Sequence, residues 1–149
     1  MSGHVEGIFI AAERGELPAS VERVRALAGR GLEGNRYYWE KGDAPPGRGV
    51  TLIAAEAMDA VAQDGIVSIE PAATRRNVLT RGIDVNDLVG KRFRIGDVEC
   101  RGVELCEPCA HLEGMTQPGV VKAFVHRAGL NADILSDGEI SVGDAVVVV

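Results

Sequence analysis

Two cysteines stand three positions apart in the stretch Cys106-Glu107-Pro108-Cys109, and His111 follows closely. A thiol that has lost its proton is a strong nucleophile, and it is also a soft metal ligand. This spacing brings two sulfur atoms close enough to form a disulfide, to share a metal ion or to divide roles. We therefore expect the chemistry of this chain to lie in this stretch.

Four uses of the two thiols remain open from the residues alone. A structural zinc ion normally takes four ligands, and the stretch provides three at most, in Cys106, Cys109 and His111. A thioredoxin-type redox pair needs a helix that begins at the first cysteine, whereas Glu113-Gly114 is expected to interrupt any helix here. A single working cysteine that carries sulfur or ligates a soft metal is the third use. Thiols that only pack a loop are the fourth.

A working cysteine would need positive charge nearby. A free thiol is only a few per cent thiolate at neutral pH, because its pKa is about 8.5. Three glutamates close in sequence would raise that pKa if no cation opposed them. Lowering the pKa by one unit takes about 1.4 kcal/mol, which a partly desolvated arginine can supply. We therefore predict that the group Arg75, Arg76 and Arg81 folds over the cysteines.

Most of the chain is expected to form short strands joined by glycine-rich turns, since it holds nineteen glycines and only six aromatic residues. The phase of the apolar alternation shifts at Gly102, which predicts a β-bulge. Cys100 falls on the apolar side of its strand, which predicts a buried thiol. Apolar runs predict strands at 4–12, 20–28, 50–53, 77–80, 93–95, 98–105, 131–135, 139–142 and 145–149.

Helices are fewer than strands in this prediction. The alanine-rich segment 54–63 predicts a helix that Asp64-Gly65 ends, and 118–127 has helical spacing after Pro118. Residues 31–39 hold three aromatic residues beside two glycines, which fits either a turn with an aromatic plug or the wall of a ligand site. Residues 41–49 contain Pro-Pro-Gly and predict a surface loop.

Composition limits the class of protein. With 149 residues, 46% hydrophobic and 26% charged, the chain suits one domain with a full core. A net charge of −6 argues against nonspecific binding of nucleic acid, and no apolar run is long enough to cross a membrane. Three cysteines fit no disulfide framework, so we expect a protein of the reducing cytoplasm. The short apolar run 5–12 contains Glu6 and is not a signal peptide.

The sequence resembles MOSC domains, the module found at the C-terminal end of molybdenum-cofactor sulfurases and also as stand-alone bacterial proteins. The resemblance covers nearly the whole chain and depends on the order and spacing of three stretches. It implies a mainly β fold with a few helices (α+β), a MOSC-type β-barrel-like body, and a single MOSC domain over residues 1–149. The three stretches are Gly31-Leu32-Glu33-Gly34-Asn35-Arg36-Tyr37, Arg75-Arg76-Asn77-Val78-Leu79-Thr80-Arg81-Gly82-Ile83 and Cys106-Glu107-Pro108-Cys109.

The resemblance also implies a pocket for the molybdenum cofactor (molybdopterin) and one essential cysteine. That cysteine corresponds to Cys109, as a persulfide carrier or a molybdenum ligand, with Cys106 as its neighbour or resolving thiol. We expect five side chains to bind the anionic pterin: Arg75, Arg76, Asn77, Arg81 and Arg36.

Three functions follow as hypotheses. The first is a MOSC protein that binds the molybdenum cofactor and acts as a sulfur carrier or sulfur transferase. The second is a molybdenum-cofactor-dependent oxidoreductase that reduces N-hydroxylated compounds with an external electron-transfer protein. The third is a non-catalytic binding domain whose thiols are structural. No pyridoxal phosphate is expected in this chain, so a separate cysteine desulfurase would load any sulfur.

Overall fold

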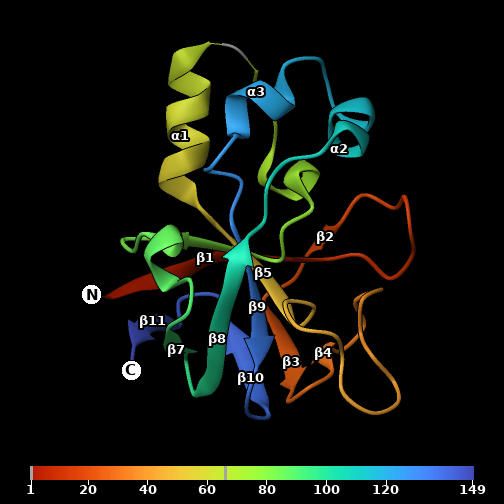
Figure 1. The fold of residues 1–149 in the computed structure, drawn as a ribbon, viewed down its shortest axis with the longest axis vertical. Helices are drawn as coiled ribbons and strands as arrows, with labels where there is room; N and C mark the ends of the chain where they lie inside the picture. Colours follow the sequence, from red (N-terminus) through yellow and green to blue (C-terminus); the bar gives the residue numbers. More distant parts are fainter. Residues whose placement is uncertain (1, 66) are drawn as a thin grey trace.

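Within the residues that the computed structural model describes, 2–65 and 67–149, seven strands close into a barrel (Figure 1). They follow the order β11-β7-β8-β9-β5-β6-β1, and pairing of β11 with β1 completes the ring. Their bounds are β1 Ser2–Ile10, β5 Val50–Ala54, β6 Val78–Arg81, β7 Arg92–Ile95, β8 Val98–Leu105, β9 Leu130–Ile134 and β11 Ala145–Val148.

Four further strands extend the barrel. β2 (Ala19–Ser20) pairs with the end of β1, and a small antiparallel sheet has the order β10-β3-β4. The bounds of that sheet are β3 Arg23–Leu27, β4 Gly31–Leu32 and β10 Gly138–Ser141. The mainly β, barrel-like fold expected from the sequence is thus confirmed.

The barrel interior is filled by the apolar side of the alternating strands. Ile8, Leu52, Phe93 and Leu130 are each fully buried there, and burying one such side chain contributes about 1.5–3 kcal/mol. The apolar C-terminal strand β11 is paired on both sides, by β7 and by β1. Its backbone therefore offers no free edge to another chain.

Strand β8 carries two of the expected features. Its register with β9 shifts between Gly102 and Glu104, which confirms the bulge. Cys100 is fully buried, as predicted, and burial raises its pKa to about 12, with smaller contributions from Asp133 and Glu99. Such a thiol stays protonated and unreactive at neutral pH.

The helices α1 (Ala55–Asp64), α2 (Ala110–Met115) and α3 (Val120–Phe124) gather at one end of the barrel (Figure 1). Helix α1 connects β5 to β6, the parallel pair of the barrel, and a second apolar cluster lies under the helices. Two 3-10 turns complete the structure, η1 (Pro71–Thr74) and η2 (Val85–Leu88). None of the helices in the described ranges has the length and apolar run that a membrane crossing requires.

The expectation that Glu113-Gly114 interrupts any helix after the cysteines is wrong, because α2 includes both residues. The Glu113 carboxylate does not end the helix but accepts hydrogen bonds from the backbone of Gly119 and Val121, at 3.2 and 3.0 Å. These bonds tie α2 to the start of α3. Helix α3 is also shorter than the predicted 118–127, because the chain leaves the helical conformation at Val125.

Candidate functional site

A cavity of about 320 Å³ opens beside the cysteine stretch. Its wall is drawn from segments far apart in sequence, which include 35–37, 46–51, 75–77, 104–112 and Asn131. The volume lies at the lower end of the range of about 300–1,000 Å³ that is usual for small-molecule sites.

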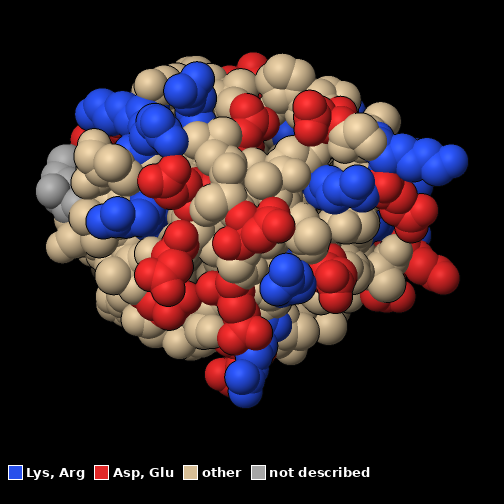
Figure 2. All heavy atoms as spheres, turned by 90° about the horizontal axis from the view of Figure 1, so that it is seen from below, with Lys and Arg blue, Asp and Glu red and all other residues tan. Residues whose placement is uncertain are grey.

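The lining of this cavity is positively charged although the chain is acidic. Among the described residues that line it are four arginines, Arg36, Arg48, Arg75 and Arg76, and one carboxylate, Glu104, which gives a formal charge of 4 − 1 = +3. The whole chain has a net charge of −6. On the face seen in Figure 2, acidic and basic side chains are instead interspersed. The local excess of guanidinium groups therefore favours an anionic ligand.

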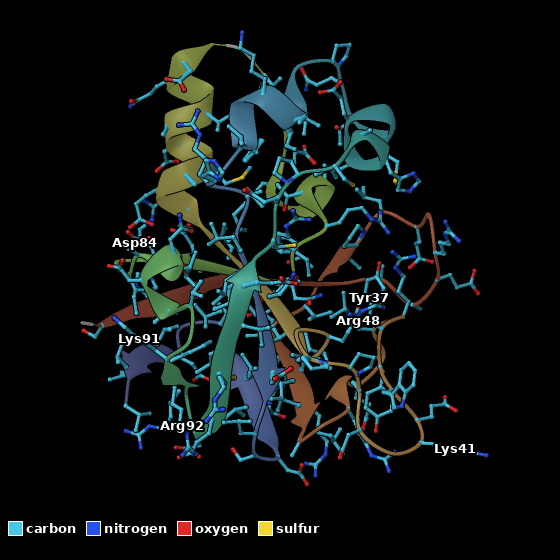
Figure 3. All side chains as sticks on the ribbon, viewed as in Figure 1. Tyr37, Lys41, Arg48, Asp84, Lys91 and Arg92 are labelled. Atoms are coloured by element: carbon cyan, nitrogen blue, oxygen red, sulfur yellow. The ribbon has the colours of Figure 1, made fainter. Side chains whose placement is uncertain are left out.

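Tyr37 and two arginines form one wall of the cavity. The guanidinium carbon of Arg36 lies 4.3 Å from the centre of the Tyr37 ring, and that of Arg48 lies 5.7 Å from it. Arg36 also donates a hydrogen bond to the Tyr37 hydroxyl. Figure 3 shows Tyr37 and Arg48 beside one another. These cation–π contacts fix the orientation of both guanidinium groups at the cavity.

Arg75 is placed by the end of η1, where its backbone takes a left-handed conformation with φ of 65°. One Nη donates to the backbone oxygen of Glu16 at 2.7 Å. Burial lowers the pKa of Arg75, and the charge of Arg36 lowers it further. Crowding of like charges is unfavourable until an anion balances it, so this pair is poised to bind one.

The side chains of Arg76 and Asn77 form hydrogen bonds with the protein backbone. The Arg76 guanidinium donates to the backbone oxygens of Ala128 at 2.8 Å, Cys106 at 2.9 Å and Thr74 at 3.2 Å. The Asn77 side chain accepts from the backbone N–H of Thr51 and donates to the backbone oxygen of Phe9, each at 3.1 Å. Both residues line the cavity, and both hold its wall in place.

The two cysteines of the stretch differ in their surroundings. Cys109 is exposed, lines the cavity and caps α2, since its sulfur accepts a hydrogen bond from the backbone N–H of Leu112 at 3.4 Å. Cys106 is half-buried and lines the same cavity. Burial raises the pKa of Cys106, and the nearby charge of Arg76 opposes this rise.

The model of the MOSC domain family matches residues 40–147, which is more than half of the chain. The chain belongs to the MOSC domain family. This confirms the resemblance seen in the sequence. MOSC domains are commonly associated with the molybdenum cofactor. A comparison with curated protein sequences finds no match.

Solved structures share this MOSC fold at low sequence identity. YuaD from Bacillus subtilis is 18% identical with a TM-score of 0.81, over 99% of this chain and 96% of that chain. YiiM from Escherichia coli is 17% identical with a TM-score of 0.73, over 100% and 70% of the two chains. YiiM from Geobacillus stearothermophilus is 15% identical with a TM-score of 0.67, over 99% and 73%. At such identities the likeness shows the fold alone.

Arg81, expected near the cysteines, is not among the described residues that line the cavity of this MOSC domain. Its guanidinium pairs with Glu6 at 2.8 Å and with Asp59 at 3.1 Å. The hydrogen bonds to these two carboxylates raise the pKa of Arg81. We therefore remove Arg81 from the candidate site.

Arg48 lines the cavity, although the sequence did not indicate it. It follows Pro-Pro-Gly in the predicted surface loop, which is in fact fastened to β9. The Gly47 N–H donates to the Asp133 side chain at 2.7 Å, and the Gly49 N–H donates to the backbone oxygen of Ala132 at 3.1 Å. An arginine two residues before a mostly buried strand was the signal that the sequence offered.

The four-ligand zinc site considered for Cys106, Cys109 and His111 has no counterpart in the described part of the chain. No three side chains of the types His, Cys, Asp and Glu come together there in a way that could hold a metal ion. His111 is exposed and lines the cavity with the two thiols. The cavity therefore combines cationic groups with cysteine sulfur.

Proposed function

We propose that this MOSC domain binds the molybdenum cofactor in the cavity, with Cys109 as the working thiol. The observation that supports this most directly is that four arginines and an exposed cysteine line one cavity in an acidic chain. Cys109 would either ligate molybdenum or carry a persulfide. Both roles use the same exposed sulfur.

The donor set fits the chemistry of this cofactor. Molybdopterin carries a phosphate, and the planar fork of a guanidinium binds phosphate through two parallel hydrogen bonds. Arg36, Arg48 and Arg75 would supply those donors, while Arg76 and Asn77 hold the wall. A cysteine sulfur suits a soft metal centre. When bound, the group supplies redox-active metal chemistry.

We further propose that residues 1–149 work as one MOSC domain in the cytoplasm. All three cysteines are free, which suits a reducing compartment. A carrier would receive its sulfur from a cysteine desulfurase, whereas a reductase of N-hydroxylated compounds would need an electron-transfer protein. Of these two, the carrier role is favoured by the second thiol, Cys106, beside Cys109 in the cavity.

Cofactor loading tests the proposal. Freshly purified protein should contain molybdenum and a fluorescent pterin, or should take them up when incubated with isolated molybdenum cofactor. Cys109→Ser should still bind the pterin through the arginines, but should hold molybdenum less firmly. A protein that takes up neither molybdenum nor pterin would contradict the proposal.

Arg48→Ala should weaken pterin binding by about tenfold or more, because it removes a phosphate donor from the cavity wall. The matched control is Arg94→Ala, an exposed arginine on β7 that does not line the cavity. A fluorescence titration of each variant measures the affinity. Equal affinity in the two variants would show that Arg48 does not touch the ligand.

A further inference from the structure

The two cavity thiols are held in different ways. The backbone N–H of Cys106 donates to Gly129 at 2.8 Å, and its carbonyl accepts from Arg76 at 2.9 Å, so this residue is fixed on both sides. Cys109 lies one loop further out, exposed, at the start of α2. An incoming sulfur donor therefore reaches Cys109 more easily than Cys106.

The loop between the thiols is also tethered. The Glu107 carboxylate accepts from the backbone N–H of His126 at 2.7 Å and contacts its Nδ1 at 2.6 Å. Pro108 is the other residue of this loop, and its ring fixes its own backbone angle φ. The loop thus holds both sulfurs at one cavity. Two thiols held this way can form a disulfide at little cost in chain entropy.

We propose that Cys106 is the resolving thiol that releases sulfide from a persulfide on Cys109. This inference rests on the carrier form of the proposed function. It assigns the two cysteines successive roles, with Cys109 loaded by a persulfide donor and Cys106 acting on it from within. The sulfide is released inside the arginine-lined cavity.

The release of sulfide is balanced without a further reactant. The Cys106 sulfur attacks the Cys109 Sγ, a sulfur–sulfur bond forms between them, and the bond from Cys109 Sγ to the outer sulfur breaks. The outer sulfur leaves with that electron pair and takes the proton of the Cys106 thiol, so it departs as hydrogen sulfide. The Cys106–Cys109 disulfide is then reduced by two electrons and two protons from an external dithiol.

Arg76 supports this role for Cys106. Burial raises the pKa of the Cys106 thiol, and the charge of Arg76 opposes this rise. The hydrogen bond from Arg76 to the Cys106 carbonyl also fixes the backbone of this residue beside the cavity. Cys100 is excluded as the resolving thiol, because it is fully buried inside the barrel.

The experiment compares reduced wild type with Cys106→Ser. Each protein is loaded with a cysteine desulfurase and L-cysteine, desalted, and followed without reductant by intact mass and a sulfide assay. Wild type should release about one sulfide per chain and end about 2 Da lighter than the reduced protein, as a disulfide. Cys106→Ser should keep an adduct of about 32 Da on Cys109 and release sulfide at least about tenfold more slowly.

Two further variants complete the test. Cys100→Ala should behave as wild type, and Cys106→Ala should repeat the result if serine perturbs the loop. Equally persistent adducts in wild type and Cys106→Ser would overturn the inference and leave the carrier role intact. A lasting adduct on Cys106 in wild type, without the loss of about 2 Da that marks the disulfide, would also overturn the inference. Absence of any adduct in Cys106→Ser would instead count against the carrier role itself.

Discussion

Arg76 shows how a residue at a site can serve the fold first. Its guanidinium joins the segment at Thr74, the cysteine stretch and Ala128 through their backbone oxygens. The sequence predicts that Arg76 folds over the cysteines as a cation and an anion-binding group, and Arg76 does reach the cysteine stretch. Its carbonyl partners were not predicted, because they cannot be read from residue types. We therefore expect Arg76 to affect ligand binding indirectly, because it holds the cysteine stretch in place.

Arg76→Ala should lower the free energy of unfolding by about 2–3 kcal/mol, because it removes hydrogen bonds from a charged donor to three carbonyls. Urea denaturation measures this change. Arg76→Lys should restore little, since one ammonium cannot span the same acceptors. Arg94→Ala is the control. A urea midpoint for Arg76→Ala equal to that of wild type would show that these hydrogen bonds do not stabilise the fold.

The buried thiol of Cys100 predicts a pH dependence. Burial raises its pKa from 9.0 to about 12, so between these values the folded chain holds a proton that the unfolded chain has lost. The stability from this group is therefore complete below pH 9 and falls as pH rises toward 12, by at most about 1.4 kcal/mol per pH unit. Unfolding measured from pH 8 to 11 should show a shallower decline in Cys100→Ala than in wild type. Equal slopes of stability against pH in the two proteins would contradict a raised pKa at Cys100.

Sequence and structure agree unevenly on the site residues. Arg36, Arg75 and Cys109 lie on one cavity, as motif order suggested. Arg81 does not, because a guanidinium pairs with the carboxylates that folding brings to it, and Glu6 is 75 residues away in sequence. Arg48 was missed because its loop is fixed by bonds to β9 that no local pattern reveals.

At the scale of elements, the strands were the most predictable part. Period-two burial gives a strong signal in β7 and β8, where alternate residues are inside the barrel. Helix α2 gave none. It has six residues, contains Gly114, and is capped by the sulfur of Cys109 in place of the usual hydroxyl or carboxylate. Short helices of this kind depend on tertiary contacts, here those of Glu113 with the start of α3.

The turn into β9 positions the cysteine stretch, and Gly129 is its critical residue. Its φ is 119°, and a Cβ there would lie 2.1 Å from the backbone oxygen of Leu52. Gly129→Ala should therefore destabilise the fold by more than about 3 kcal/mol and displace Cys106, whose N–H it binds. Thermal unfolding and thiol reactivity measure the two effects.

The control for Gly129→Ala is Gly114→Ala in α2. A Cβ at Gly114 meets nothing within 4 Å, so alanine should raise helix stability by about 0.5–1 kcal/mol. A Gly129→Ala protein as stable as wild type would show that the turn tolerates a different backbone path.

At the scale of the whole molecule, closure of the barrel depends on β11. This strand lies between β7 and β1 and completes the ring of hydrogen bonds. Deleting residues 145–149 should unpair both neighbours and expose the fully buried Phe93 and Val5, so the chain should lose its cooperative unfolding transition. Deleting Val149 alone, which lies beyond β11 and is 64% exposed, should shift the transition only slightly. Calorimetry distinguishes the outcomes, and a cooperative transition in the longer deletion would contradict this account.

The cavity wall takes residues from Ala11 to Asn131, segments far apart in the sequence. A molecule seated there acts as a non-covalent cross-link across most of the chain, and it must leave when the barrel opens. Ligand at a hundred times its Kd would then add about 2.7 kcal/mol to the global free energy of unfolding. Two preparations of the same chain, one loaded and one empty, should melt at different temperatures. Melting temperature is therefore a label-free readout with which to screen candidate anions before any reaction is known.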